Sequence, residues 1–511
     1  MKNSKQFWLS DYMIMGYFAL LSLVLHLIAI QGYGWFRDEF YYMSCSDHLD
    51  FGYVDQPPLS TFILKIVRLL LGDSVIAIRL LPVLSAAAFV FLTGMIAKEL
   101  GGKKFAIALA SAAAFAPIGN FFLFNIYSMN FLDLLFWQAC ILIVLKIVKT
   151  GNPKYWLAFG LVAGLGLQNK ISVLFLCFGL AVGIILSKER KYLKSKYLYF
   201  GAAIAGLLFL PYILWNMTHG WATLEFMHNA KVYKMSEVTP QGFLFGQILY
   251  NNPVTFIIWL AGLWYFFFHK EGKTYRIFGW MYLAIYVLFT IQQAKDYYLA
   301  PIYPILFAGG AVLYETWFRQ KQWTWPKPVL IVLILVSSLM LCPLTLPILS
   351  EETVGKMGQA LGLSDRAGEK HEMGVLPQHF ADMHGWEEMV GKVAAVYNTL
   401  SEQEKKECII YATNYGVTGA ITVLGKKYHL PPAFSGHNNH WFWPPEGYSG
   451  NVLIIVGGRK EDHENSYKEV VEMDRTDCQY CMPYENHKPI WLCKGLKRPF
   501  KEIWPTVRFF I

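Results

Sequence analysis

The stretch LLSLVLHLIAIQGYGWFRDEFYYMS, residues 20–44, decides the class of fold. Its first half ends an apolar run that is long enough to cross a bilayer, which takes about 20 mostly apolar residues. Its second half places two neighbouring carboxylates, Asp38 and Glu39, among aromatic side chains directly after that run. A carboxylate in such a place is costly unless it is paired or functional. We therefore expect a membrane protein whose first outer loop carries chemistry.

The composition agrees with a membrane protein. Of the 511 residues, 55% are apolar and 16% are charged, whereas a soluble chain would carry about 25% charged residues. The net charge of +9 does not indicate nucleic acid, because no basic stripe lies on a soluble element. Basic cytoplasmic loops explain it better. No small-residue cleavage site follows the first apolar run, so we expect that run to remain as an anchor.

Apolar runs predict about eleven membrane-spanning helices. They lie near 11–31, 75–97, 104–123, 130–148, 155–169, 171–187, 197–216, 243–268, 276–293, 297–317 and 327–349. Gln168-Asn169-Lys170 interrupts the segment 155–187, so either two short spans meet there or one long helix is broken. Residues 1–349 would form this transmembrane domain.

Loop charges orient the predicted spans. The basic connections alternate along the chain: Lys2 with Lys5, then 98–104, 146–154, 187–196, 269–276 and 318–322. Alternation of this kind is typical of the cytoplasmic face. With eleven spans the N-terminus would be cytoplasmic, and the first outer loop, about 32–74, would face outside together with the C-terminus. Within this loop, the amphipathic run in 51–70 predicts a helix lying in the membrane interface.

Residues 350–511 have the character of a soluble domain. Short apolar runs at 408–413, 451–458 and 489–495 predict strands, and 385–400 and 419–428 predict helices between them. This alternation favours a small extracytoplasmic α/β domain. In an oxidising compartment we expect a disulfide among Cys478, Cys481 and Cys493, since one CxxC pair is at best half of a zinc site.

Several polar residues are expected on the outer side, near the acidic pair. They are Asp55, Asn130, Asp133, Lys170, His228, Lys231, Lys295 and Tyr298. Each has an ordinary explanation, because interfacial lysines and tyrosines often snorkel and a single loop histidine is usually solvated. Taken together, carboxylates can act as a general base or hold a divalent metal through oxygen, and lysines suit a phosphate. The pattern predicts group transfer from a phosphate-activated donor in the membrane.

Ordered motifs along almost the whole chain resemble the glycosyltransferases of the GT-C fold. Within that class the chain is most similar to family 39, which includes protein O-mannosyltransferases and the bacterial aminoarabinose transferase acting on lipid A. The motifs are RDE at 37–39, YVDQPPLS at 53–60, RLLPVLSAA at 79–87, Asp133, GLGLQNK ending at Lys170, and YYLAPIYP at 297–304. The soluble part resembles bacterial members through TNYGVTGAITVLG at 413–425 and LPPAFSGHNNHWFWPP at 430–445.

The resemblance implies a polyprenyl-phosphate sugar as donor and inversion at the anomeric carbon. Asp38 would be the base, supported by Glu39, while Lys170 and Tyr298 would contact the donor phosphate. Asp133 would be a second acidic group, and Asp55 and His228 would belong to the same cavity. Where such enzymes often have His or Glu-Lys before the proline, this chain has Asp55-Gln56. Lys65, Lys231 or Lys295 would then have to supply the missing cation.

The expected partners are the polyprenyl-phosphate sugar, a lipid, glycan or protein acceptor, and the bilayer, in a bacterial plasma membrane. A divalent metal is compatible with the carboxylates but is not required, since lysines can neutralise the phosphate. The alternative class is a flippase or another lipid transporter. That alternative leaves the α/β domain unexplained, and no inverted repeat of broken helices is visible. The stretch SGHNNHWFWPP at 435–445 suits either carbohydrate binding or a buried structural loop.

Overall fold

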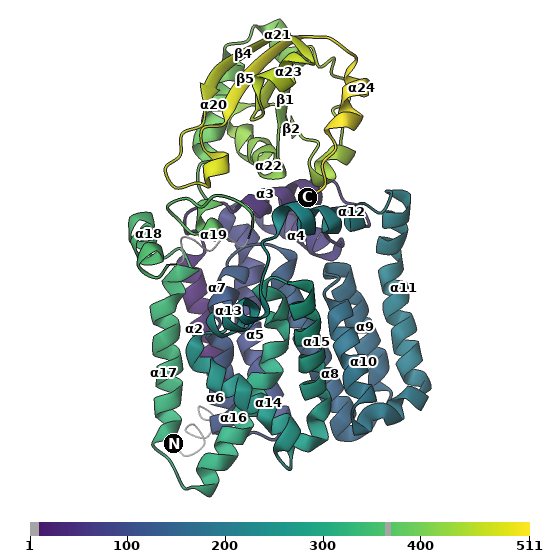
Figure 1. Cartoon of the computed structure of the whole chain (residues 1–511), viewed down its shortest axis with the longest axis vertical. Coiled ribbons are helices and arrows are strands. Elements are labelled where there is room, and N and C mark those ends of the chain that lie inside the picture. The colour runs from purple at the N-terminus through teal and green to yellow at the C-terminus, as the bar shows by residue number, and fades with distance from the viewer. Residues whose placement is uncertain (1–9, 363–368) are drawn as a thin grey trace. The chain divides into compact units, whose positions relative to one another are not determined.

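The computed structural model describes residues 10–362 and 369–511, so the predicted cytoplasmic charges Lys2 and Lys5 lie outside the described residues. The chain is mostly helical (Figure 1) and separates into two compact units. The helical unit comprises Ile76–Leu214, Glu237–Ile348 and the described residues up to Gln31. The α/β unit comprises Gly32–Val75, Trp215–Ser236 and the described residues from Leu349 to Ile511.

All eleven predicted spans contain helix. The helices are α2 (Asp11–Ala29), α5 (Val75–Glu99), α6 (Lys104–Phe115), α7 (Ile118–Leu123), α8 (Met129–Thr150), α9 (Tyr155–Asn169), α10 (Val173–Ile185), α11 (Lys196–Thr218), α13 (Pro240–Tyr250), α14 (Phe256–Phe268), α15 (Arg276–Gln292), α16 (Tyr303–Gln320) and α17 (Pro326–Leu341). Seven helical stretches among the described residues are long and apolar enough to cross a bilayer unaided. The chain is therefore a multi-pass membrane protein.

The other predicted spans are short or bent, for local reasons. The segment 104–123 divides into α6 and α7 at Pro117, and α13 and α14 meet at an angle of 101° around Pro253. Proline removes a backbone donor and clashes with the preceding turn, which ends or bends a helix. The segment 155–187 consists of two helices, α9 and α10, separated at Lys170. Two short helices are therefore observed in this segment, and not one long broken helix.

The sheet of the α/β unit contains five strands in the order β2-β1-β3-β5-β4. They are β1 (Cys408–Ala412), β2 (Ala433–Phe434), β3 (Val452–Val456), β4 (Tyr467–Arg475) and β5 (Pro489–Leu496). β1 runs parallel to β2 and β3, whereas β5 is antiparallel to β3 and β4. The three predicted strands are confirmed as β1, β3 and β5. β2 has only two residues and β4 is largely polar, so neither gave an apolar signal.

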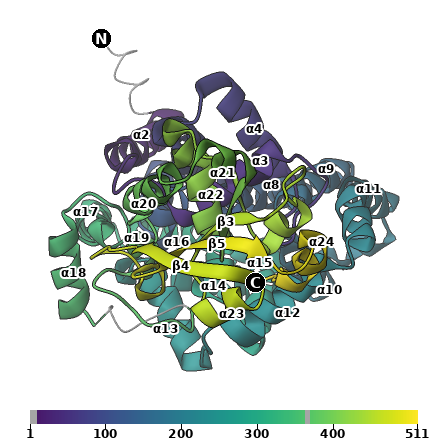
Figure 2. The same cartoon turned by 90° about the horizontal axis from the view of Figure 1, so that it is seen from above.

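Two helices cover one face of this sheet, as Figure 2 shows. They are α20 (Trp386–Asn398) and α22 (Tyr415–Leu424), which confirm the two helices predicted in this region. Alternate residues of the strands, such as Ile410 and Ile454, pack against these helices. The intervening residues, such as Leu453 and Trp491, form a second apolar cluster on the other face. Both faces of this mixed sheet therefore carry apolar clusters.

The segments Gly32–Val75 and Trp215–Ser236 belong to the α/β unit. They contain α3 (Arg37–Asp47), α4 (Leu59–Leu71), α12 (Ala222–Asn229) and the π-helical turn η2 (Ala230–Lys234). Phe40 of α3 packs edge-on against Trp386 of α20, with ring centroids 5.6 Å apart. The core of the unit therefore joins parts of the chain that lie more than 300 positions apart in the sequence.

The predicted amphipathic helix is present as α4. Its Leu64 is buried, while Ile66, Leu69, Leu70 and Leu71 are exposed. Arg68 holds the C-terminal end through ion pairs to Asp47 and Asp73, at 2.9 and 2.7 Å. An exposed apolar face beside cationic side chains is typical of a helix in the membrane interface.

The predicted disulfide is wrong for this structure, in which all eight cysteines of the chain are thiols. Cys493 is buried in the apolar cluster on the far face of β5. Cys478 and Cys481 instead form a hydrogen-bonded pair, in which the Cys481 thiol donates to the carbonyl of Cys478 at 3.2 Å. The Cys478 sulfur in turn accepts from the backbone N–H of Cys481 at 3.2 Å.

Candidate functional site

Asp38 lies in the first turn of α3 and is held at one carboxylate oxygen. The Tyr415 hydroxyl donates a hydrogen bond to Oδ1 at 2.8 Å, and Nε of Arg37 lies 3.8 Å from the same oxygen. The Asp38 side chain keeps 37% of its surface exposed, against 11% for Arg37. Asp38 can therefore meet a ligand while its partners stay buried. Arg37, the sequence neighbour of Asp38, thus forms an ion pair with it.

A second carboxylate supports Arg37 from the C-terminal part of the chain. Asp382 lies 3.6 Å from the Arg37 guanidinium and accepts a hydrogen bond from the Tyr484 hydroxyl at 3.2 Å. Arg37 also donates to the hydroxyl of Tyr484. Burial raises the pKa of Asp382 to about 6, and the charge of Arg37 opposes the rise. The two carboxylates on either side of Arg37 thus differ in exposure, since Asp382 is buried.

The Glu39 side chain caps the N-terminus of its own helix, α3. The side chain is wholly buried, and Oε2 accepts a hydrogen bond from the backbone N–H of Phe36 at 2.9 Å. A glutamate at this position satisfies one of the backbone donors that the start of a helix leaves unpaired. The contact gives Glu39 a structural function in orienting α3, while its supporting part in catalysis stays a prediction.

Asp55, also in the α/β unit, is paired with a different tyrosine from the one that binds Asp38. Its Oδ1 accepts a hydrogen bond from the Tyr41 hydroxyl at 2.8 Å, and burial raises its pKa to about 6. The charge of Asp38 adds to this rise, and that of Lys234 opposes it. The ring of Tyr41 lies 5.1 Å from that of Tyr415. Two tyrosine–carboxylate pairs therefore lie side by side.

Within the helical unit, Lys170 and Asp133 form a buried ion pair. The Lys170 ammonium lies 3.6 Å from Oδ2 of Asp133 and donates to Oδ1 of Asn130 at 2.7 Å. The hydroxyl of Ser172 donates to Oδ1 of Asp133 at 2.5 Å. The loop between α9 and α10 supplies the lysine and the serine, and α8 supplies Asp133. Buried charges inside a membrane protein usually mark a functional site.

Tyr298 contacts Lys170 and belongs to the short helix η5 (Asp296–Ile302), which precedes α16. The Lys170 ammonium lies 5.3 Å from the ring centroids of both Tyr297 and Tyr298. Such cation–π contacts hold a lysine in place and leave its remaining N–H groups for an anion. Lys295 directly precedes this turn. The grouping of Lys170, Asp133 and Tyr298, predicted from separate parts of the sequence, is thus observed.

The remaining predicted residues are dispersed. His228 near the end of α12 and Lys231 in η2 are exposed. Lys65 is engaged with Asp47 at 3.3 Å. The turn that contains Lys231 also supplies Lys234, a second cation of the loop 217–242. The Lys234 ammonium lies 3.6 Å from Oε1 of Glu369, and its charge acts on Asp55. Spacing alone gives no reason to choose Lys234 over Lys231.

The stretch 435–445 is largely a buried structural loop, one of its two predicted alternatives. The Asn439 side chain accepts from the backbone N–H of Val54 at 2.6 Å. His440 is buried beside Tyr41, and burial lowers its pKa to about 3. Trp443 stacks on His48 with centroids 4.1 Å apart. These contacts tie the loop to the YVDQPP segment and to α3.

Metal ligands are not grouped in the part of the chain that the structure describes. Among residues 10–362 and 369–511, no cluster of three or more His, Cys, Asp or Glu side chains could hold a metal ion. Asp38 and Asp55 each bond to a tyrosine hydroxyl.

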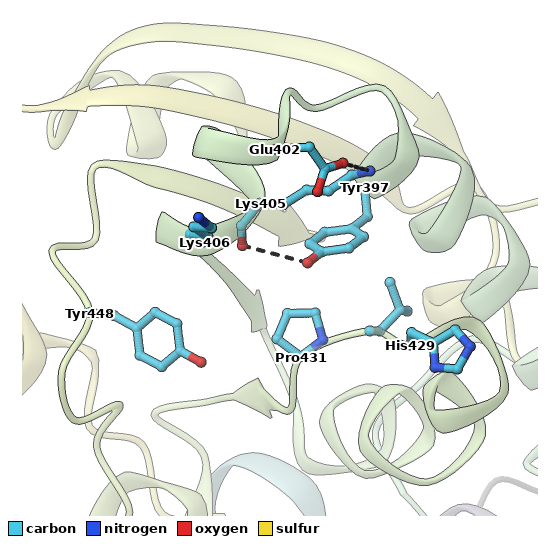
Figure 3. A pocket seen from close by; sticks show the side chains of 8 residues that line it. Tyr397, Glu402, Lys405, Lys406, His429, Pro431 and Tyr448 are labelled. Carbon is cyan, nitrogen blue, oxygen red and sulfur yellow. Dashed lines mark hydrogen bonds and ion pairs between the residues drawn. The ribbon is translucent and has the colours of Figure 1, made fainter.

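A separate hollow of about 400 Å³ lies at the far end of α20 (Figure 3). It is lined by Tyr397, Glu402, Lys405, Lys406, His429, Leu430, Pro431 and Tyr448. Figure 3 shows Lys405 paired with Glu402, whose charges are 2.9 Å apart. The opposite end of α20 begins at Trp386, and this tryptophan packs against Phe40 of α3. The hollow therefore shares no residue with the Asp38 network.

Comparison with known proteins places this geometry in context. Residues 55–215 match the family described as dolichyl-phosphate-mannose-protein mannosyltransferase. The lipid A galacturonosyltransferase RgtD of Rhizobium johnstonii is 24% identical over 295 residues, which cover 56% of this chain and 61% of that protein. The matched region is thus under two thirds of that relative's length.

Solved structures match over nearly the full length. ArnT from Cupriavidus metallidurans in the apo state has a TM-score of 0.60 at 14% identity, covering 93% of this chain and 96% of that one. The same protein bound to undecaprenyl phosphate has a TM-score of 0.59 at 13% identity, covering 93% and 97%. This chain therefore has the GT-C fold, and residues 55–215 resemble the mannosyltransferase family in sequence.

Proposed function

We propose that this family 39-like GT-C glycosyltransferase moves a sugar from a polyprenyl-phosphate donor to an acceptor outside the cytoplasm. The observation that carries the proposal is a partly exposed carboxylate, Asp38, held at a single oxygen in a chain of this fold. The sequence similarity to a lipid A galacturonosyltransferase and the fold shared with a protein that binds undecaprenyl phosphate support the same donor class. Function still has to be argued from the site, because one fold can carry many activities.

In the proposed reaction Asp38 is the general base. It takes the proton from an acceptor hydroxyl or amine while that oxygen or nitrogen attacks the anomeric carbon. The bond from the anomeric carbon to the phosphate oxygen breaks, and the polyprenyl phosphate leaves with the electron pair. Attack opposite the leaving phosphate inverts the anomeric centre. Glu39 acts only through the helix that carries Asp38.

Lys170 and Tyr298 receive the donor phosphate in this proposal. The Lys170 ammonium is already fixed by Asn130 and Asp133, so binding the phosphate costs little additional ordering of the side chain. A buried ammonium stabilises the negative charge that develops on the leaving phosphate more strongly than a solvated one could. Lys295, next to the same turn, and Lys231 are the further candidate donor contacts, while Asp55 and His228 are candidate contacts for the acceptor.

The proposal also assigns sides of the membrane. The N-terminus lies in the cytoplasm of a bacterial cell in this proposal, and 350–511 lie outside the plasma membrane, which the basic connections support. The acceptor is then lipid A, another glycolipid, a cell-envelope glycan or a protein. Lysine can neutralise the phosphate without a metal, so a divalent cation is optional in this scheme.

One experiment separates this proposal from the lipid flippase alternative. Purified protein in nanodiscs is incubated with polyprenyl-phosphate sugars labelled in the sugar, together with extracted envelope lipids and glycans. We expect free polyprenyl phosphate to appear in step with labelled acceptor. Movement of the intact lipid between leaflets of a proteoliposome, with no release of polyprenyl phosphate, would instead identify a flippase.

A further inference from the structure

We infer that Tyr415 is a positioning residue, whose hydroxyl fixes Asp38 so that the second carboxylate oxygen faces the acceptor. The inference rests on the proposed function. It also assigns the α/β unit a direct part in sugar transfer, because the residue that orients the base comes from α22, about 380 positions along the chain from α3. Asp38 remains the group that would touch the substrate.

Both side-chain contacts of Asp38 are made by the same carboxylate oxygen. Tyr415 and Arg37 both engage Oδ1, at 2.8 and 3.8 Å. No hydrogen bond to Oδ2 is found within residues 10–362 and 369–511. A carboxylate fixed at one oxygen and open at the other presents one defined oxygen atom to an incoming proton. This is the preorganisation that general-base catalysis requires.

Tyr415 is itself held rigidly. It opens α22, whose N-terminus is closed by Asn414 accepting from the backbone N–H of Val417 at 3.0 Å. Its own backbone N–H donates to Nδ1 of His437 at 3.3 Å, and the Arg37 guanidinium lies 5.2 Å from its ring centroid. Burial raises the pKa of Tyr415 well above its usual value, so the hydroxyl keeps its proton and acts as a donor.

Two glycines allow α22 to approach α3 closely enough for this contact. A Cβ on Gly419 would lie 2.7 Å from Cβ and 2.9 Å from the backbone carbon of Phe40. A Cβ on Gly416 would lie 2.4 Å from Cγ of Arg37. The obstacle at Gly419 includes backbone, which cannot rotate away as a side chain can. Any side chain at position 419 would push α22 from the helix that carries Asp38.

The test measures steady-state transfer by Tyr415→Phe, which removes only the hydroxyl. Without its donor the Asp38 carboxylate can rotate, and misplacement of a catalytic group can cost about 100-fold in rate. We expect kcat to fall roughly 10- to 100-fold, with little change in KM for the donor. Gly419→Ala provides a second test that keeps the Tyr415 hydroxyl and moves its helix, and it decides the matter if Tyr415→Phe does not fold.

Tyr467→Phe is the matched control. The Tyr467 hydroxyl is also buried in the α/β unit and donates to the carbonyl of Gly450 at 2.9 Å, but it belongs to the edge strand β4. Removal of the Tyr467 hydroxyl should leave kcat within about twofold of the parent protein, because a substitution far from the site is independent of the catalytic residues. Equal losses in Tyr415→Phe and Tyr467→Phe would show a merely structural effect and overturn the inference.

A double-mutant cycle with Asp38→Glu shows whether Tyr415 acts through Asp38. If the hydroxyl only orients Asp38, Tyr415→Phe should cost much less in the Asp38→Glu background than in the parent. If Tyr415→Phe lowered kcat by the same factor in the parent and in the Asp38→Glu variant, a positioning role would be contradicted. Full kcat in Tyr415→Phe beside an inactive Asp38→Asn overturns the inference alone and leaves the proposed function standing. An active Asp38→Asn removes both.

Discussion

The ammonium of Lys170 lies 3.6 Å from Oδ2 of Asp133, and both side chains are almost completely buried in the helical unit. The break between α9 and α10 places the lysine, and α8 places the aspartate. Removing charges from water costs several kcal/mol each unless they are paired and hydrogen-bonded. A pair that a membrane protein maintains at this cost should matter for function as well as for stability.

Lys170→Gln should abolish transfer and destabilise the protein. Breaking a buried ion pair by removing one partner costs about 3–5 kcal/mol, because the other charge is left uncompensated. The double variant Lys170→Gln with Asp133→Asn should recover most of the stability and none of the activity. Thermal unfolding in detergent and the transfer assay provide the two measurements. Recovery of activity in the double variant would show that Lys170 serves the fold rather than the phosphate.

The pH dependence of stability should report the buried carboxylate of Asp55. Its pKa is raised by burial from 3.8 to about 6, so the folded protein prefers the protonated form. Its stabilising contribution is complete below about pH 4 and is lost as the pH rises through 6. Asp55→Asn should therefore become more stable relative to the parent across this interval, by the order of 1 kcal/mol. Denaturant unfolding at pH 4, 5, 6 and 7 measures the difference, and a constant difference would refute the assignment.

The sequence predicted the helical unit well and the partners of Asp38 poorly. Long apolar runs are a strong local signal, so every predicted span contains helix. Lys170 and Asp133 were found because a charge stands out inside an apolar run. By contrast, α3 is polar and aromatic without helical periodicity, and its contact with Tyr415 depends on the tertiary fold. Tyr415 lies within the quoted motif TNYGVTG, but nothing local indicates that its hydroxyl reaches Asp38.

Cys478 should be the most reactive thiol of the chain. Its hydrogen bond with Cys481 lowers its pKa to about 7, and its side chain is partly exposed. Burial raises the pKa of Cys493 and of Cys408, which leaves those thiols protonated and shielded. Brief treatment with iodoacetamide at pH 7, followed by peptide mass spectrometry, should find the label first at Cys478. Comparable labelling of Cys493 would show that the thiol pair has another arrangement.

The exposed apolar face of α4 should contact lipid. Leu69 and Leu70 are exposed at 73% and 77%, beside Lys65 and Arg68. A nitroxide on Leu70→Cys in nanodiscs should therefore be relaxed more by oxygen than by a water-soluble nickel chelate. Lys468→Cys on the exposed side of β4 is the control, and there the chelate should dominate. A Leu70 label with the same accessibility as the Lys468 label would remove α4 from the interface.

The most direct test of the central claim is the rate of sugar transfer by purified Asp38→Asn. The amide is nearly isosteric with the carboxylate and still accepts the Tyr415 hydrogen bond, but it cannot take a proton. Loss of a general base costs about 10²–10⁴-fold, so polyprenyl phosphate release should fall by at least about 100-fold while the variant elutes and melts like the parent. A folded Asp38→Asn protein that transfers sugar at the parental rate would contradict the account.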